Sequence, residues 1–289
     1  MTTNASAEVK AFFDPDTFTV TYVVADISSG ECAIIDSVLD YDPDSGRTGT
    51  KSADQVIAYI EENNYSLKWI LETHVHADHL TAGPYLKEKL GGKTAIGNLV
   101  PIIQNTFGPV FNAGSDFATD GSQFDQLFSN DESFNIGGLT AKVLHTPGHT
   151  PACVTYVIDG ACYVGDTMFM PDFGTARCDF PGGDAAELYS SIQRILSMPD
   201  DTVLYMCHDY GPGGRDYKWI TSVGEQKSEN IHLAGKNREE YIEARTSRDA
   251  ELSMPKLILP SVQVNMRGGV FPAADNNGTS YIKIPLNKL

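Results

Sequence analysis

Basic residues and cysteines are scarce in this sequence. The 289-residue chain holds 21 Lys and Arg residues against 38 Asp and Glu residues, so its formal net charge is −17. Such a surface repels phosphate backbones and anionic lipids, which argues against nucleic acid and membrane partners. The five cysteines are odd in number and no two are spaced C-x-x-C, which argues against a disulfide framework and a thiolate zinc knuckle. We therefore expect a protein of the reducing cytoplasm.

Other signals are also absent. No apolar run approaches the ~20 residues of a membrane span, and residues 1–10 have neither the basic start nor the apolar stretch of a secretory signal. The sequence contains no G-x-S-x-G elbow, no P-loop and no G-x-G-x-x-G fingerprint. These absences weaken the case for a serine hydrolase, a nucleoside triphosphatase or a dinucleotide-dependent oxidoreductase.

Short apolar strands alternate with helices in both halves of the chain. The strand pattern covers residues 17–25, 32–35, 67–71, 141–144, 153–158, 161–164 and 202–206. Helices are predicted over residues 52–63, 85–90, 184–195 and 237–252. The first is opened by a capping box from Ser52 to Gln55, and the third is capped by Asp184 with Glu187. Residues 107–135 read as a long surface excursion, and residues 254 onward as a tail.

This organisation predicts one compact α/β unit. We expect a catalytic domain over residues 1–235 and a C-terminal extension, residues 236–289, packed on the same domain. The alternation of strands and helices places functional residues at the ends of strands, where ligand sites in such folds gather.

Potential metal ligands follow the ends of the predicted strands. They are His74, His76, Asp78, His79, His149, Asp166 and His208. Imidazole and carboxylate groups suit zinc and iron, so we expect these side chains to converge on a metal site. The residue types present could serve one metal ion or two. The pattern assigns no role to His232.

The same residues resemble the metal motifs of the metallo-β-lactamase superfamily. Residues 73–79 read Thr-His-Val-His-Ala-Asp-His, similar to its H-x-H-x-D-H signature, and the later motifs occur in the same order. The resemblance covers residues 17–210. It implies a four-layer αββα sandwich, with the site along one edge of two packed sheets.

Within that superfamily, the chain is similar to the persulfide dioxygenases, which resemble glyoxalase II. The similarity rests on residues 73–83, the Arg-x-Asp-Phe block that begins at Arg177 and the Cys-His-Asp-Tyr-Gly stretch at 207–211. The tail near 254–257 looks like that of the bacterial form of the family, which has a longer C-terminus. It implies an enzyme that oxidises glutathione persulfide with O₂ and water to sulfite and glutathione. A homodimer is a further expectation of this resemblance.

The resemblance also implies roles for the ligand-type residues. One Fe(II) ion per chain would be bound by His74, His149 and Asp166, a set that leaves coordination positions open for substrate. The remaining four residues would orient those ligands and hydrogen-bond metal-bound water. They are His76, Asp78, His79 and His208.

Glutathione carries two carboxylates, so an acidic protein needs local cations to bind it. Arg177, Arg215 and Lys218 lie near the metal motifs in the sequence. Tyr210 follows His208 by two positions, where glyoxalase-like relatives place a tyrosine on glutathione. We predict substrate contacts for these four residues, although Arg215 and Lys218 are equally consistent with surface salt bridges.

Two other classes of function compete with the dioxygenase. A dinuclear zinc glutathione thioesterase of the hydroxyacylglutathione hydrolase type would use all the predicted ligands for two metal ions. A non-catalytic module that kept the fold for partner binding would have no reason to retain the complete ligand set. Paired metals would distinguish the first class, and failure to bind iron the second.

Overall fold

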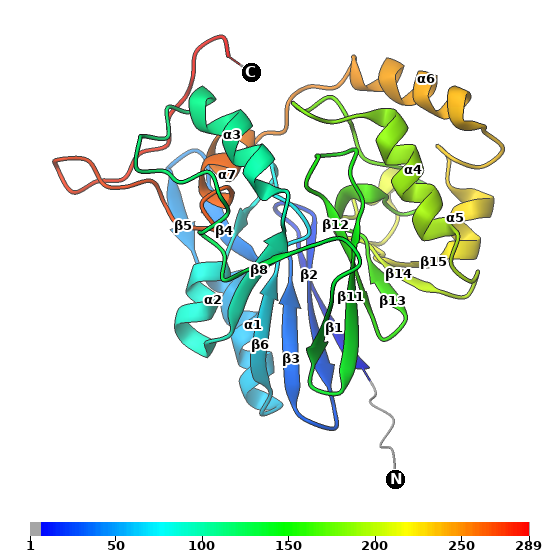
Figure 1. Ribbon diagram of the computed structural model, residues 1–289, viewed down its shortest axis with the longest axis horizontal. Helices are drawn as coiled ribbons and strands as arrows, with labels where there is room; N and C mark the ends of the chain where they lie inside the picture. Colours follow the sequence, from blue (N-terminus) through cyan, green and yellow to red (C-terminus); the bar gives the residue numbers. More distant parts are fainter. Residues whose placement is uncertain (1–6, 289) are drawn as a thin grey trace.

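The computed structural model of the protein describes residues 7–288. Over these residues, two six-stranded sheets pack face to face, and helices cover their outer faces (Figure 1). The strand order is β1-β2-β3-β6-β8-β9 in the first sheet and β10-β11-β12-β13-β14-β15 in the second. The αββα sandwich expected from the sequence is therefore confirmed.

The strands and helices have the following bounds. The first sheet contains β1 (Ala7–Asp14), β2 (Thr19–Asp26), β3 (Glu31–Ile35), β6 (Ser66–Leu71), β8 (Lys93–Gly97) and β9 (Gln126–Phe128). The second contains β10 (Ser133–Ile136), β11 (Leu139–His145), β12 (Val154–Ile158), β13 (Ala161–Tyr163), β14 (Val203–Tyr205) and β15 (Ile220–Ser222). A small sheet joins β4 (Val38–Asp42), β5 (Arg47–Gly49) and β7 (Leu80–Thr81).

The helices are α1 (Lys51–Glu62), α2 (Gly83–Leu90), α3 (Val100–Val110), α4 (Ala185–Leu196), α5 (Val223–Glu229), α6 (Arg238–Asp249) and α7 (Ile258–Asn265). Within residues 7–288, none of them is both long enough and apolar enough to cross a membrane. In Figure 1, α1 and α2 lie beside the first sheet, and α4, α5 and α6 beside the second.

Strand β2 shows why the first sheet lies between two apolar layers. Every residue of β2 is buried. Val20, Tyr22 and Val24 pack into the core between the two sheets, whereas Val23 and Ala25 pack against the residues of α1 and α2. Successive side chains of a strand point to opposite faces, so a strand that is apolar on both faces must lie between two apolar layers.

The two predicted helix caps have different outcomes. At α4, the Asp184 carboxylate accepts hydrogen bonds from the backbone N–H groups of Ala186 and Glu187, as a capping residue does. The capping box predicted at Ser52 is wrong, because α1 begins one residue earlier at Lys51. The Ser52 hydroxyl instead donates to Asp40 on β4, 2.5 Å away.

The surface excursion predicted over residues 107–135 is irregular over residues 111–125, but the prediction is wrong where a helix and two strands occupy parts of it. Helix α3 continues through Val110, and β9 and β10 add edge strands to the two sheets. The aromatic residues Phe107, Phe124, Phe128 and Phe134 are buried. Polar residues separate these rings at irregular intervals, so no helical or strand period signals their burial.

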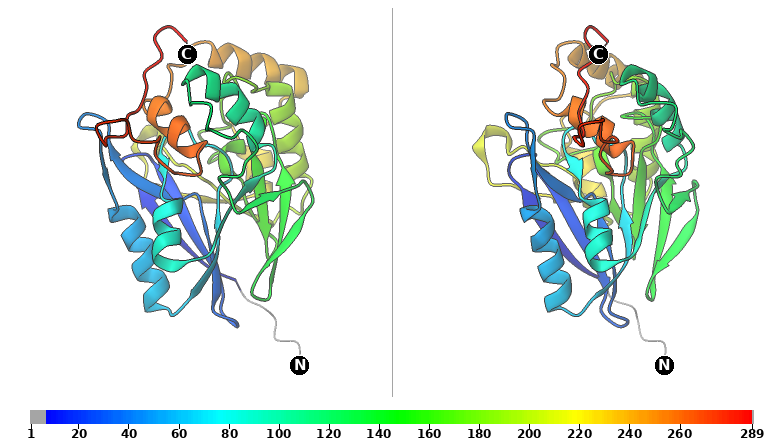
Figure 2. Two further views of the ribbon diagram at one scale, coloured as in Figure 1. Left: turned by 60° about the vertical axis from the view of Figure 1, so that its left-hand side comes forward. Right: turned by 90° about the vertical axis from the view of Figure 1, so that its left-hand side faces the viewer.

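The C-terminal segment adds two helices to the sandwich. Tyr241 of α6 is buried in the hydrophobic cluster beneath α4. Helix α7 lies in the segment predicted as a tail, and its residues Ile258 and Val262 pack with α3. Figure 2 shows α7 in orange beside α3 at the upper end of the sheets. The domain boundary at residue 235 stays a prediction.

Gly148, in the loop after β11, lies against helix α4. Its φ is +133°, and a Cβ at this position would come within 2.3 Å of the backbone Cα and N of Leu188. Gly148→Ala should therefore lower the free energy of unfolding by roughly 3 kcal/mol or more, because a helix backbone cannot move aside cheaply. Chemical denaturation measures this loss.

Gly160→Ala is the control for backbone strain alone, since Gly160 has φ +83° with nothing within 4 Å of an added Cβ. It should cost roughly 1–2 kcal/mol. Equal losses in the two variants would contradict the clash with α4.

His232 stabilises the loop between β13 and α4 in its neutral form, because the Thr175 N–H donates to its Nδ1 over 2.9 Å. Burial, assisted by the charges of Arg245 and Arg248, lowers the pKa of His232 to about 4. An unfolded histidine titrates near pH 6.5. The unfolded state therefore binds the extra proton first, and His232 should reduce stability as the pH falls from about 6.5 to about 4.

His232→Asn keeps an acceptor for the Thr175 N–H and removes the titration. Urea unfolding at several pH values across this window should show a flatter pH dependence in the variant than in the wild type. The same pH dependence of stability in both proteins would show that His232 does not contribute to it.

Candidate metal centre and substrate cavity

The predicted ligands come together at one end of the sandwich. The histidines at 74, 76 and 79 follow β6, while His149, Asp166 and His208 follow β11, β13 and β14. The two sheets meet here, because the Val20 N–H donates to the Cys207 carbonyl over 2.7 Å. Side chains that follow strands of different sheets therefore converge on this seam.

The ligand atoms form two neighbouring groups. One group is His74, His149 and Asp166, and the other is His76, Asp78, His79 and His208. Within each group, the potential ligand atoms lie within 4.8 Å of one another. Asp166 lies between the groups, with one oxygen 3.7 Å from His149 Nε2 and the other 3.2 Å from His208 Nε2. This arrangement offers donor sets for one or two cations.

Each histidine is anchored through one ring nitrogen. The contacts are His74 Nδ1 to Thr73 Oγ1 (3.0 Å), His76 Nε2 to Asp36 Oδ1 (3.0 Å), His79 Nδ1 to Thr19 Oγ1 (3.3 Å), His149 Nδ1 to the Arg177 carbonyl (2.8 Å) and His208 Nδ1 to the Phe18 carbonyl (3.3 Å). In a metal-binding histidine, one ring nitrogen is fixed by a hydrogen bond and the other is available to the metal, as it is here.

The second ring nitrogen of each histidine shows whether these residues fit a metal ion. Among residues 7–288, four such nitrogens are buried and make no hydrogen bond: His74 Nε2, His76 Nδ1, His79 Nε2 and His208 Nε2. Of these, His208 Nε2 has close ion-pair contacts, 3.1 Å from an Asp78 oxygen and 3.2 Å from an Asp166 oxygen. A buried polar atom that makes no hydrogen bond costs about 1–3 kcal/mol. Four such atoms in one cluster fit a metal site, because a bound cation would satisfy them together.

Asp36, which the sequence analysis does not single out, anchors two of these histidines. It is buried directly after β3 with φ +52°. Its carboxylate accepts hydrogen bonds from the Thr73 N–H (2.7 Å), the Thr73 hydroxyl (2.9 Å) and His76 Nε2 (3.0 Å). The Thr73 hydroxyl in turn contacts His74. The position of Asp36, an acidic residue directly after an apolar strand, could have identified it from the sequence, as the same position identified Asp166.

Burial and charge shift the histidine pKa values in opposite directions. Burial and the neighbouring imidazoles lower the pKa of His74. Burial acts in the same direction on His76, but the carboxylates of Asp36 and Glu72 outweigh it and raise the pKa. Burial also opposes protonation of His208, yet Asp78 and Asp166 raise its pKa to about 9. A cation would therefore displace protons here, and its binding weakens as the pH falls.

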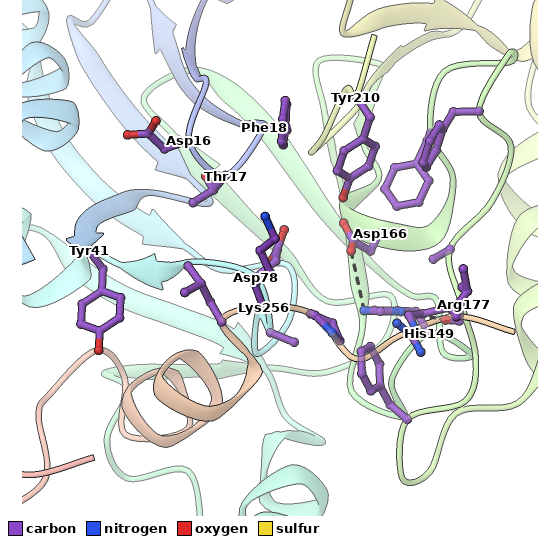
Figure 3. Close-up of a pocket in the computed structure, with 18 of the residues that line it drawn as sticks. Asp16, Thr17, Phe18, Tyr41, Asp78, His149, Asp166, Arg177, Tyr210 and Lys256 are labelled. Atoms are coloured by element: carbon purple, nitrogen blue, oxygen red, sulfur yellow. Dashed lines mark hydrogen bonds and ion pairs between the residues drawn. The ribbon is translucent and has the colours of Figure 1, made fainter. Parts of the chain in front are cut away.

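A cavity of about 940 Å³ opens over the cluster. Asp78, His149 and Asp166 line it at the metal end (Figure 3). The Phe and Tyr residues that line it are Phe18, Tyr41, Phe169, Phe173, Phe180 and Tyr210. The Tyr210 ring lies 4.6 Å from that of Phe173 and 5.5 Å from that of Phe18, and Figure 3 shows its hydroxyl directed toward Asp166. The metal end of the cavity thus has an apolar wall.

The four predicted substrate contacts separate into two pairs. Arg177 and Tyr210 line the cavity, whereas Arg215 and Lys218 do not. The Arg215 guanidinium instead donates to the carboxylates of Asp172 and Asp209, at distances of 2.5–2.8 Å. Lys218 is exposed. The salt-bridge interpretation therefore describes Arg215, and we do not carry either residue forward as a substrate contact.

Arg177 is already engaged within the protein. It donates to both carboxylate oxygens of Asp179 over 2.6 Å and to the Ser253 carbonyl over 2.7 Å. Its own carbonyl accepts the hydrogen bond from His149. These contacts tie the wall of the cavity to a ligand of the metal group.

The sequence analysis missed three exposed cations at the cavity. Arg47, Arg248 and Lys256 line it and are exposed. No ion pair among the described residues involves any of them, whereas Arg177 and Arg245, which also line the cavity, are paired with Asp179 and Asp249. They lie far from the metal motifs in the sequence, so proximity along the chain could not reveal them.

Comparison with known proteins agrees with this geometry. The profile of the Metallo-beta-lactamase superfamily matches residues 14–208. The chain is 54% identical to a probable metallo-hydrolase of Burkholderia pseudomallei, over 97% of this chain and 99% of the relative. It is 50% identical to Glyoxylase B2 of Dictyostelium discoideum, over 98% of each protein.

More distant relatives include the mitochondrial persulfide dioxygenase ETHE1 of Homo sapiens, 28% identical over 91% of this chain and 89% of that protein. The crystal structure of ETHE1 from Myxococcus xanthus matches with a TM-score of 0.73 at 29% identity, over 91% of this chain and 100% of that one. The resemblance inferred from the motifs is confirmed, and the chain belongs to the metallo-β-lactamase superfamily.

Proposed function

We propose that this protein is an iron-dependent persulfide dioxygenase that converts glutathione persulfide, O₂ and water to sulfite and glutathione. The observation that carries the proposal is the group of His74, His149 and Asp166, whose ligand atoms lie within 4.8 Å of one another. Two of the three line an open cavity. Two histidines and one carboxylate form the ligand set of non-haem Fe(II) oxygenases. Similarity to ETHE1 proteins over 91% of the chain supports the assignment.

The residues of the chain would hold and shield this chemistry. When bound, ferrous iron supplies the redox change and Lewis acidity that oxygenation of sulfur requires. The Arg177 carbonyl fixes the orientation of His149. The rings of Phe169 and Phe173 pack against the ring of Tyr210, whose hydroxyl is directed toward Asp166. They would keep bulk water from the terminal sulfur of the persulfide.

The cavity also offers anchors for glutathione. Arg47, Arg248 and Lys256 are cations without ion pairs among the described residues, in a chain of net charge −17. Three such cations at one cavity favour an anionic substrate, and glutathione has two carboxylates for them. Tyr210 stays a predicted contact. Arg177 also stays one, although a substrate carboxylate would compete with Asp179 for it.

A dinuclear zinc thioesterase acting on glutathione thioesters is the second candidate. The group of His76, Asp78, His79 and His208 favours it, because three of its nitrogens are buried and make no hydrogen bond. The names of the Burkholderia and Dictyostelium relatives point the same way. In the dioxygenase, these residues would orient the iron ligands and hydrogen-bond water beside them.

Metal content and O₂ uptake distinguish the two candidates. Protein purified without air should contain about one iron per chain and consume O₂ with glutathione persulfide, releasing sulfite in step. Asp166→Ala should lose metal and lower the activity by more than ~100-fold, because it removes the charged ligand. Elemental analysis and an O₂ electrode measure both. Two zinc ions per chain, with hydrolysis of S-lactoylglutathione and no O₂ uptake, would establish the thioesterase instead.

The cation assignment predicts a change in KM alone. The double variant Arg248→Ala, Lys256→Ala should raise KM for glutathione persulfide by about tenfold while kcat and iron content stay near wild type, because loss of ~1.4 kcal/mol of binding is tenfold in affinity. Lys218→Ala is the matched control, since Lys218 is an exposed cation away from the cavity. An unchanged KM in the double variant would place the carboxylates of the substrate elsewhere.

A further inference from the structure

Asn265, the last residue of α7, lies against the loop that carries half of the ligand cluster. Its side chain is 3% exposed. The Nδ2 group donates to the backbone carbonyls of His76 (2.9 Å) and His79 (2.7 Å), and Oδ1 accepts from the Thr81 N–H (2.9 Å). Both N–H groups and the carbonyl of the Asn265 amide therefore form hydrogen bonds with residues 76–81.

The backbone that Asn265 binds has no regular secondary structure of its own. Residues 72–79 connect β6 to β7 as a loop. His76 and His79 are nevertheless fully buried, and buried carbonyl groups need hydrogen-bond partners. Because α7 supplies those partners, the backbone position of three potential ligands, His76, Asp78 and His79, depends on a helix almost 190 residues later.

The other C-terminal helix makes a similar contact with the opposite side of the site. Arg245 of α6 donates to the Thr175 carbonyl (2.9 Å) and to Asp249 (2.5 Å), and Asp249 accepts from the Cys178 N–H (2.8 Å). Between these two backbone contacts lies Arg177, whose carbonyl holds His149. The C-terminal segment therefore reaches both ligand-bearing loops.

We propose that Asn265 is a positioning residue of the metal centre, and that α7 therefore belongs to the functional site. Its amide holds the His76 and His79 carbonyls at the spacing that aims the free ring nitrogens at the metal. The inference rests on the metal centre of the proposed function, but it holds for iron or zinc and needs no reaction with O₂.

Gln263, two residues before Asn265 on α7, provides a matched control. It is 2% exposed, and its Nε2 donates to the carbonyls of Leu259 (2.7 Å) and Lys283 (2.9 Å) while Oε1 accepts from the Lys283 N–H (3.0 Å). Asn265→Asp and Gln263→Glu therefore make the same chemical change. Each removes two donations to backbone carbonyls and keeps one acceptor, but only Asn265 touches the ligand loop.

The test is the affinity of the full-length chain for Co²⁺ alone, measured by chelator competition and by the visible absorption of the bound ion. Asn265→Asp should raise the Kd for Co²⁺ by at least about tenfold and shift the absorption bands. Gln263→Glu should leave both near wild type, even where thermal unfolding shows equal destabilisation of the metal-free variants. Equal Kd values in the two variants would overturn the proposal.

An uncharged pair covers the case in which Asn265→Asp does not fold. Asn265→Ala should weaken Co²⁺ binding relative to Gln263→Ala in the same assay, and wild-type affinity in Asn265→Ala would overturn the proposal. Neither assay uses a persulfide or O₂. A chain that lacks dioxygenase activity would therefore still give a clear result on Asn265.

Discussion

The buried carboxylate of Asp36 is the constraint on which the metal end of this protein depends. Burial acts to raise its pKa, but the hydrogen bonds and charge of His76, together with the Thr73 N–H and hydroxyl, outweigh burial and lower the pKa. An uncompensated buried charge costs several kcal/mol. Asp36 is therefore stable only when Thr73 and His76 are in place, and the backbone at φ +52° holds it there. The position of one acid thus fixes the rotamers of His74 and His76.

The site divides its tasks among three parts of the chain. The loop after β6 and the loops after β11, β13 and β14 supply the ligand atoms. The segment 169–180 and Tyr210 supply the aromatic wall, and the β4–β5 hairpin with residues 248–256 supplies cations. The ligand atoms alone do not separate dioxygenase from hydrolase, because both groups of ligands are complete. The cations favour an anionic substrate in either case.

Sequence patterns were informative where the chemistry is local. The H-x-H-x-D-H motif and the acids and histidines after strands identified the cluster, because strand ends meet at one edge of a sandwich. The sequence left Arg215 open between a substrate contact and a surface salt bridge, because one of its two carboxylate partners, Asp172, lies 43 residues away and is invisible to local patterns. Asn265 was missed for the same reason, since a lone amide in an apolar stretch has no pattern that predicts its contact with residues 76–81. Helix α3 and its buried aromatics show no period that distinguishes them from a loop.

The hydrogen bond from Val20 to Cys207 marks a seam between the two halves of the sandwich, and the ligand cluster straddles it. A cation bound to residues from both sides would act as a non-covalent cross-link, so part of its binding free energy would count toward cohesion of the two sheets. Starving the cell of that metal would then weaken the protein where its halves join, and turnover of the polypeptide would follow the supply of the ion.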